Sequence, residues 1–87
     1  MTTLAKLAGR FSEADIDDEI VVMRLDNGDF FSLSGTAASA WRLIDGMRDR
    51  DALVTELGRE FDGDEATIAT DVDAFLAQLR EANLLAG

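Results

Sequence analysis

Side chains able to do chemistry are few in this sequence, because it contains no Cys, no His and no Tyr. Thiolates and imidazoles are the usual ligands of structural zinc, and they are common nucleophiles and general bases in enzymes. Their absence excludes a disulfide framework, an ordinary zinc site and a Ser/His or Cys/His nucleophile pair. Apart from the arginines, only carboxylates and a single lysine, Lys6, remain as charged side chains. We therefore expect no enzymatic activity and no cofactor.

Clustered carboxylates do not change this expectation. The acidic segments Asp15–Glu19 and Asp62–Glu65 lack the Asp-x-Asp-x-Asp-Gly spacing with a distant Glu that a calcium loop needs, so we interpret them as solvated turns. Asp71 and Asp73 stand two residues apart in an expected helix and therefore point in different directions. No apolar neighbour is paired with them to raise a pKa for acid–base work.

The charge balance limits the partners. Eighteen acidic residues against eight basic ones give a net charge of -10, which repels a phosphate backbone. No stretch approaches the roughly 20 apolar residues of a membrane span, and the start of the chain lacks the apolar region of a signal peptide. We expect a cytoplasmic protein that binds neither nucleic acid nor membranes.

The 87 residues are enough for one domain, residues 1–87, and 47% of them are apolar. Residues 1–10 are expected to form either a flexible arm or the lead into a first strand. Glu19–Leu25 is dense in β-branched residues and predicts the clearest strand. The Asn27-Gly28 pair that follows predicts a type I′ turn, after which Phe30–Leu33 returns as the second strand of a hairpin. Residues 10–13 could form a third, weaker strand.

Three helices are expected after the hairpin. The first begins at Ser34 or Thr36 and ends before Gly46, with Trp41 as an anchor in the core. The second spans about residues 51–61 and is capped near residue 49, and the third runs from Asp64 to about residue 83. Strands followed by helices predict an α+β domain in which the helices cover one face of the sheet.

The second hairpin strand, Asp29–Ser34, should lie at the edge of the sheet if residues 10–13 pair on the far side of the first. Neither Lys nor Pro blunts this edge, and it carries two Phe residues. An extended peptide could add there as a further strand, with the third helix as the second wall. Two alternatives stay open, in which the edge pairs with a second copy of the chain or the N-terminal arm covers it.

A serine at a helix start in a small acidic domain also suggests an acyl carrier protein. Ser34 lies in Leu-Ser-Gly and not in the Asp-Ser-Leu motif of those carriers, and it follows a strand hairpin that they do not possess. We therefore give this alternative little weight.

Residues from about Phe11 to Leu85 resemble the PqqD-like family, also called RiPP recognition elements. These are small domains that recognise peptides in pathways of ribosomally made, post-translationally modified peptides. The matching features follow one another along most of the chain: Phe30-Phe-Ser-Leu33, Thr36-Ala-x-x-x-Trp41-x-Leu-Ile-Asp-Gly46, Leu53-x-x-x-Leu57-x-x-x-Phe61-Asp62, Ile68-x-x-Asp71-Val72-x-x-Phe75-Leu76-x-x-Leu79 and Asn83-Leu-Leu85.

The resemblance implies a winged helix-turn-helix-like fold, with a three-stranded antiparallel sheet followed by three helices. It also implies a chaperone that binds the leader segment of a precursor peptide as an added strand, between the third strand and the third helix. Carried onto this sequence, the strand wall consists of Asp29, Phe30, Phe31, Ser32 and Leu33. The helix wall is chosen beside the expected core stripe of Ile68, Val72, Leu76 and Leu79, and it consists of Asp71, Ala74, Phe75 and Gln78.

The resemblance further implies a separate modifying enzyme or leader peptidase as a partner. A lasso-peptide pathway is favoured, with pyrroloquinoline quinone assembly second. The acidity of the chain favours a leader with Lys or Arg near its anchor residues. The alternatives are a winged-helix transcriptional regulator and a dimerisation module, with a monomer or weak dimer expected. Residues 64–83 carry five carboxylates against Arg80 alone, a balance of -4, which disfavours the regulator.

Overall fold

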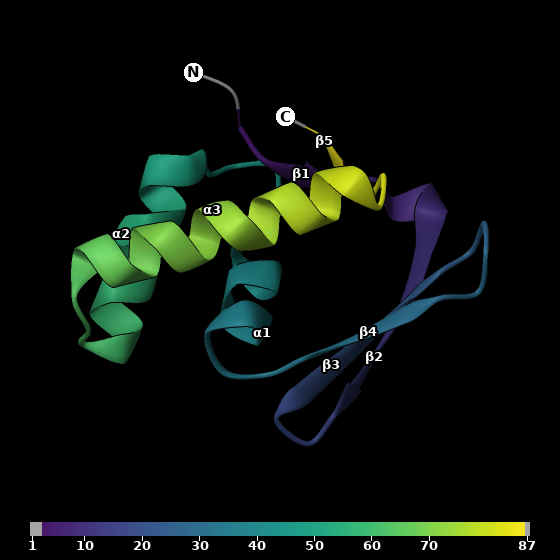
Figure 1. Ribbon diagram of the computed structural model, residues 1–87, viewed down its shortest axis with the longest axis horizontal. Helices are drawn as coiled ribbons and strands as arrows, with labels where there is room; N and C mark the ends of the chain where they lie inside the picture. Colours follow the sequence, from purple (N-terminus) through teal and green to yellow (C-terminus); the bar gives the residue numbers. More distant parts are fainter. Residues whose placement is uncertain (1–2, 87) are drawn as a thin grey trace.

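The computed structural model describes residues 3–86 and shows an α+β fold. A three-stranded antiparallel sheet precedes three helices, as predicted. The helices lie together on one side of the molecule, and the sheet projects from them as a twisted wing (Figure 1). The longest helix, α3 (Glu65–Glu81), runs across the other two.

The sheet consists of β2 (Phe11–Ile16), β3 (Glu19–Arg24) and β4 (Phe30–Leu33), in the order β2-β3-β4. The predicted third strand at residues 10–13 therefore exists and extends to Ile16. Alternation along β3 places Ile20 and Val22, each 1% exposed, on the face toward the helices. The opposite face is open to solvent and carries the directly paired Met23 and Phe30.

The turn between β3 and β4 differs from the prediction. A type I′ turn needs positive φ at both central residues, but only Gly28, at 76°, has one, and Asn27 does not. The Arg24 N–H donates to the Asp29 carbonyl (2.7 Å), which leaves residues 25–28 as the loop. Asn27 contributes through its side chain, which accepts from the Asp29 N–H (3.0 Å). The hairpin was predicted correctly and its turn type was wrong, because the loop is too long for a two-residue turn.

Local sequence signals set the helix boundaries. The other two helices are α1 (Gly35–Leu43) and α2 (Arg50–Phe61). Asp49 caps α2, and both α2 and α3 end beside non-glycine residues in the left-handed region, Asp62 (φ 48°) and Asn83 (φ 59°). Ser34 is the N-cap residue of α1, but its side chain makes no capping hydrogen bond.

The Asp49 cap gives a test of how much one helix start contributes to stability. Its carboxylate accepts from the Ala52 N–H at 2.9 Å. We expect Asp49→Ala to lower the free energy of unfolding by about 1 kcal/mol, because an N–H of the first turn loses its partner. Urea denaturation followed by circular dichroism measures this. Asp51→Ala, on the exposed first turn, is the matched control and should change stability by less than about half as much.

Trp41 lies at the centre of the core with 0% of its surface exposed. The Phe11 ring meets it edge to face at 5.0 Å, and the Lys6 Nζ lies 4.4 Å from its ring centroid. Its indole Nε1 donates to the Glu13 carboxylate at 2.8 Å. Burial lowers the pKa of Lys6, and the charge of Glu13 offsets part of this effect. The expectation that Trp41 anchors the core is confirmed.

The first residues of the described chain do not form a free arm. Leu4 is buried, and its N–H donates to the Arg48 carbonyl at 2.8 Å. The short strand β1 (Ala5–Lys6) pairs antiparallel with β5 (Leu85–Ala86), which follows α3. This N-terminal segment, which is too short to predict a helix, is thus held in place by backbone pairing with residues that are distant in the sequence. Residues 1 and 2 of the expected arm lie outside the described residues.

Two further findings concern residues 3–86. No helix there is both long and apolar enough to cross a membrane. That part of the chain also has no group of three His, Cys, Asp or Glu side chains that could hold a metal ion.

Candidate functional site

The outer side of β4 is an open sheet edge. β4 pairs with β3 alone, and the N-terminal strand β1 pairs with β5 instead of covering it. Within residues 3–86, no strand therefore occupies this edge. The prediction that β4 lies at the edge is confirmed, and the described part of the N-terminal arm does not cover it.

Two backbone hydrogen bonds of β3 show which backbone groups of β4 face the open edge. The Leu25 N–H donates to the Arg10 carbonyl (3.0 Å), whereas the Arg24 N–H donates to the Asp29 carbonyl (2.7 Å). Odd-numbered residues of β3 therefore bond to β2, and even-numbered ones bond to β4. In the register of β3 and β4, the partners of the even-numbered residues are Phe31 and Leu33. The N–H and C=O groups of Phe30 and Ser32 are thus the ones directed outward.

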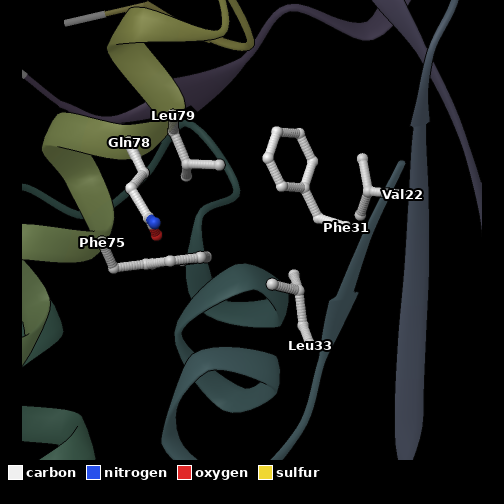
Figure 2. A pocket seen from close by; sticks show the side chains of 6 residues that line it. All are labelled: Val22, Phe31, Leu33, Phe75, Gln78 and Leu79. Atoms are coloured by element: carbon white, nitrogen blue, oxygen red, sulfur yellow. The ribbon is translucent and has the colours of Figure 1, made fainter. Parts of the chain in front are cut away.

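The side chains of β4 alternate between the two faces of the sheet. Phe31 and Leu33 point away from solvent and toward α3, where Phe75, Gln78 and Leu79 face them (Figure 2). Together with Val22 these residues line a pocket of about 20 Å³, which we call the apolar pocket. That volume holds about one water molecule or methyl group.

Gln78 is the only polar side chain that lines the apolar pocket. Figure 2 shows its amide between Phe75 and Leu79, on the side of α3 that faces the strands. An amide at this place can hydrogen-bond a ligand at the margin of an otherwise carbon-lined surface.

A second pocket shares the lining residue Phe75 with the first and reaches the start of α1. We call it the Asp71 pocket, and it has a volume of about 220 Å³. Phe75 lines both pockets and lies between them along α3. The residues of the Asp71 pocket come from the end of β4, the first turns of α1 and the middle of α3: Ser34, Thr36, Ala37, Ala40, Asp71, Val72 and Phe75. We call the two pockets together with the β4 edge the groove.

The two pockets of the groove bring together five of the nine predicted site residues. Four of them line the apolar pocket and the fifth, Asp71, lines the Asp71 pocket; the four are Phe31, Leu33, Phe75 and Gln78. Phe75 is only 8% exposed, so it belongs to both the groove and the core.

The side chains of the other four predicted residues line neither pocket, although the outward backbone groups of Phe30 and Ser32 belong to the β4 edge of the groove. Phe30, 69% exposed, and Ser32 direct their side chains to the outer face of the sheet, where the Ser32 Oγ donates to Glu19 (3.2 Å). Asp29 precedes β4 and pairs with Arg24 through its backbone. Ala74 is exposed on α3 and lines neither pocket.

The sequence interpretation missed several residues of the groove. Leu79 was assigned to the core, where it is indeed buried, yet it also lines the apolar pocket. Val22 could have been found from the alternation that places it opposite Phe31. No sequence signal indicates that Thr36, Ala37 and Ala40 face α3 across a pocket, because this depends on how α1 packs.

Carboxyl groups with shifted pKa values do not mark the groove as a reaction centre. The Arg24 guanidinium lowers the pKa of Asp26, and the Arg50 guanidinium lowers the pKa of Asp73. Both are surface ion pairs, and neither aspartate lines the groove. An open strand edge beside apolar side chains is instead suited to bind an extended chain.

A three-stranded antiparallel sheet followed by three helices, with α3 beside the open edge, defines a winged helix-turn-helix-like fold. The family model described as Coenzyme PQQ synthesis protein D (PqqD) matches residues 19–85. The chain belongs to this family.

A curated relative is similar to part of the chain. It is named PqqA binding protein, comes from Gluconobacter oxydans (strain 621H), and is 38% identical over 55 residues. These residues are 63% of this chain and 57% of the relative, so the match spans little more than half of the relative's length.

Two solved structures are similar over nearly the whole chain. One is TbiB1 in complex with the TbiA(beta) leader peptide, with a TM-score of 0.80 and 29% identity, covering 90% of this chain and 91% of that one. The other is a lasso peptide synthetase B1 complexed with its leader peptide, with a TM-score of 0.81 and 18% identity, covering 97% and 98%. The second similarity supports the fold alone.

Proposed function

We propose that this chain binds the leader segment of a ribosomally synthesised precursor peptide as an added strand on β4, beside α3. The observation that carries the proposal is the open β4 edge with an apolar pocket between it and α3. The PqqA binding protein and the leader complex of TbiB1 support it, because both names describe proteins that bind such peptides.

Backbone and side chains have separate roles in this proposal. The outward N–H and C=O groups of Phe30 and Ser32 hydrogen-bond the peptide whatever its sequence. Every second side chain of the peptide then faces Phe31, Leu33 and α3, where shape and apolarity select it. Phe75 and Gln78 provide the helix wall, whereas Asp29 and Ala74 line neither pocket.

The chain acts as a binding partner and not as an enzyme, and a separate modifying enzyme or leader peptidase receives the bound peptide. Within this proposal a lasso pathway ranks first and pyrroloquinoline quinone assembly second. Titration with the TbiA(beta) leader and with PqqA distinguishes the two, because the peptide closer to the chain's own leader should bind more tightly.

Calorimetric titration with the leader of the precursor encoded beside this chain tests the proposal. We expect a dissociation constant between micromolar and tens of nanomolar, about -8 to -10 kcal/mol. A single added strand forms a small interface and the flexible leader loses entropy when it is ordered, which limits the affinity.

Amide exchange locates the site in the same samples. New protection should appear at residues 29–34 and along α3, with little change in β2. No heat and no protection at about 100 micromolar leader would contradict the proposed function.

A further inference from the structure

The Asp71 pocket is the larger of the two pockets in the groove, and the proposed function gives it no occupant. Its volume is about 220 Å³, compared with about 20 Å³ for the apolar pocket. The apolar pocket therefore has room for little more than a methyl group as it stands, whereas the Asp71 pocket can accept a long side chain.

The lining of the Asp71 pocket combines an apolar floor with a polar rim. Ala37, Ala40 and Phe75 contribute carbon surface, and Ser34, Thr36 and Asp71 contribute hydroxyl and carboxylate groups. Within the part of the chain that the structure describes, the Asp71 carboxylate makes no hydrogen bond or ion pair, and the two hydroxyls make none either.

A nearby carboxylate on the same helix shows the contrast. Asp73 receives two hydrogen bonds from the Arg50 guanidinium, both at 2.9 Å. No Lys or Arg lines the Asp71 pocket, so Asp71 keeps an uncompensated negative charge there. An isolated carboxylate at an apolar surface attracts a cationic hydrogen-bond donor.

The start of α1 has the opposite polarity and has to be weighed against Asp71. Free N–H groups in the first turn of a helix amount to about half a positive charge. Asp71 carries a full negative charge, and the chain as a whole carries -10. An anion would therefore be repelled, whereas the N–H groups can donate hydrogen bonds to a backbone carbonyl of the peptide.

From this geometry we propose that the Asp71 pocket binds a Lys or Arg side chain of the bound leader peptide. The aliphatic stem packs on Ala37, Ala40 and Phe75, and the charged head reaches Asp71 and the hydroxyls of the rim. This assignment rests on the proposed function and adds a specificity for basic residues to it.

The two pockets fix the spacing of the leader's anchor residues. Their linings on α3 span residues 71–75 and 75–79, about one helical turn apart. One turn rises about 5.4 Å, close to the roughly 6.8 Å between residues i and i+2 of a strand. The basic residue should therefore stand two positions from the apolar anchor, on the same side of the peptide.

Calorimetry with Asp71→Asn tests the assignment, because this isosteric change removes only the charge. We expect the variant to bind the chain's own leader about fivefold more weakly at low salt. Replacing the basic leader residue by Met, which keeps most of the aliphatic stem and removes the charge, should weaken binding to the wild-type chain by about the same factor and leave binding to Asp71→Asn unchanged. The charge reversal Asp71→Lys should be rescued by a Glu at that position of the leader.

Asp73→Asn is the matched control, since Asp73 lies on α3 outside the pocket and should leave affinity unchanged. Urea denaturation of each variant confirms that the fold is intact. If the wild-type chain binds its leader and Asp71→Asn binds it equally well, the cation site is wrong while the proposed function stands. A leader that binds without a Lys or Arg at the predicted position would likewise show that the cation site is wrong while the proposed function stands. A wild-type chain that does not bind its leader overturns both.

Discussion

Ser32→Pro is expected to weaken leader binding at least about thirtyfold while the domain stays folded. The Ser32 N–H faces the open edge, so proline removes a donor that the peptide needs, and its ring obstructs the approach of the peptide backbone. Loss of one or two hydrogen bonds and of close contact amounts to about 2 kcal/mol, or thirtyfold. Calorimetric titration of the leader measures the change.

The same substitution also tests the alternation of hydrogen bonds along β4. Because the Ser32 N–H has no partner in β3, we expect the free energy of unfolding to fall by only about 1 kcal/mol. Ser32→Ala removes the side-chain bond to Glu19 without touching the backbone, and it should bind like the wild-type chain. Wild-type affinity in Ser32→Pro means that the leader does not add to β4, and an unfolded Ser32→Pro means that the Ser32 N–H points inward.

Trp41→Ala is expected to have the largest effect on stability of any single change in this domain. Removing a fully buried Trp from a core costs about 3 to 5 kcal/mol. At 0.05 to 0.15 kcal/mol per residue, the whole domain has roughly 4 to 13 kcal/mol to lose. We therefore expect Tm to fall by about 15 to 30 °C in a thermal melt followed by circular dichroism.

Trp41→Phe separates the contribution of buried apolar surface to stability from that of the indole's polar contacts. Phenylalanine keeps most of the buried surface but loses the hydrogen bond to Glu13 and part of the interaction with Lys6. It should destabilise the domain by about half as much as alanine. A Tm shift below about 5 °C for Trp41→Ala would show that the core does not depend on this residue.

Local signals in the sequence predicted most of the fold. The hairpin, the edge position of β4, the Asp49 cap and the end of the third helix near residue 83 each depend on residues close together in the chain, and all are present. The turn type was wrong because the Arg24 and Asp29 pairing leaves residues 25–28 in the loop, too many for a two-residue turn. For residues 3–10 the sequence left an arm and the lead into a strand as alternatives, because the backbone partners that hold them, Arg48 and Leu84, are distant in the sequence.

The candidate site was predicted less completely than the fold, for a similar reason. Alternation along β4 separates Phe31 from Phe30, but only the structure shows which of the two faces α3. Helical periodicity identified Asp71 and Gln78 beside the core stripe. It could not reveal that α1 packs so that Thr36 and Ala40 form the other side of a pocket with Asp71.

The pairing of β1 with β5 has a mechanical consequence for recognition. It fastens the chain just after α3 to the segment before β2, so the helix and the sheet are tied together beyond the groove. With β4 and α3 held in place, we expect the distance between them to change little when the peptide binds. The conformational entropy lost on binding is then mainly that of the peptide. Preorganisation of the domain therefore offsets the small area of contact.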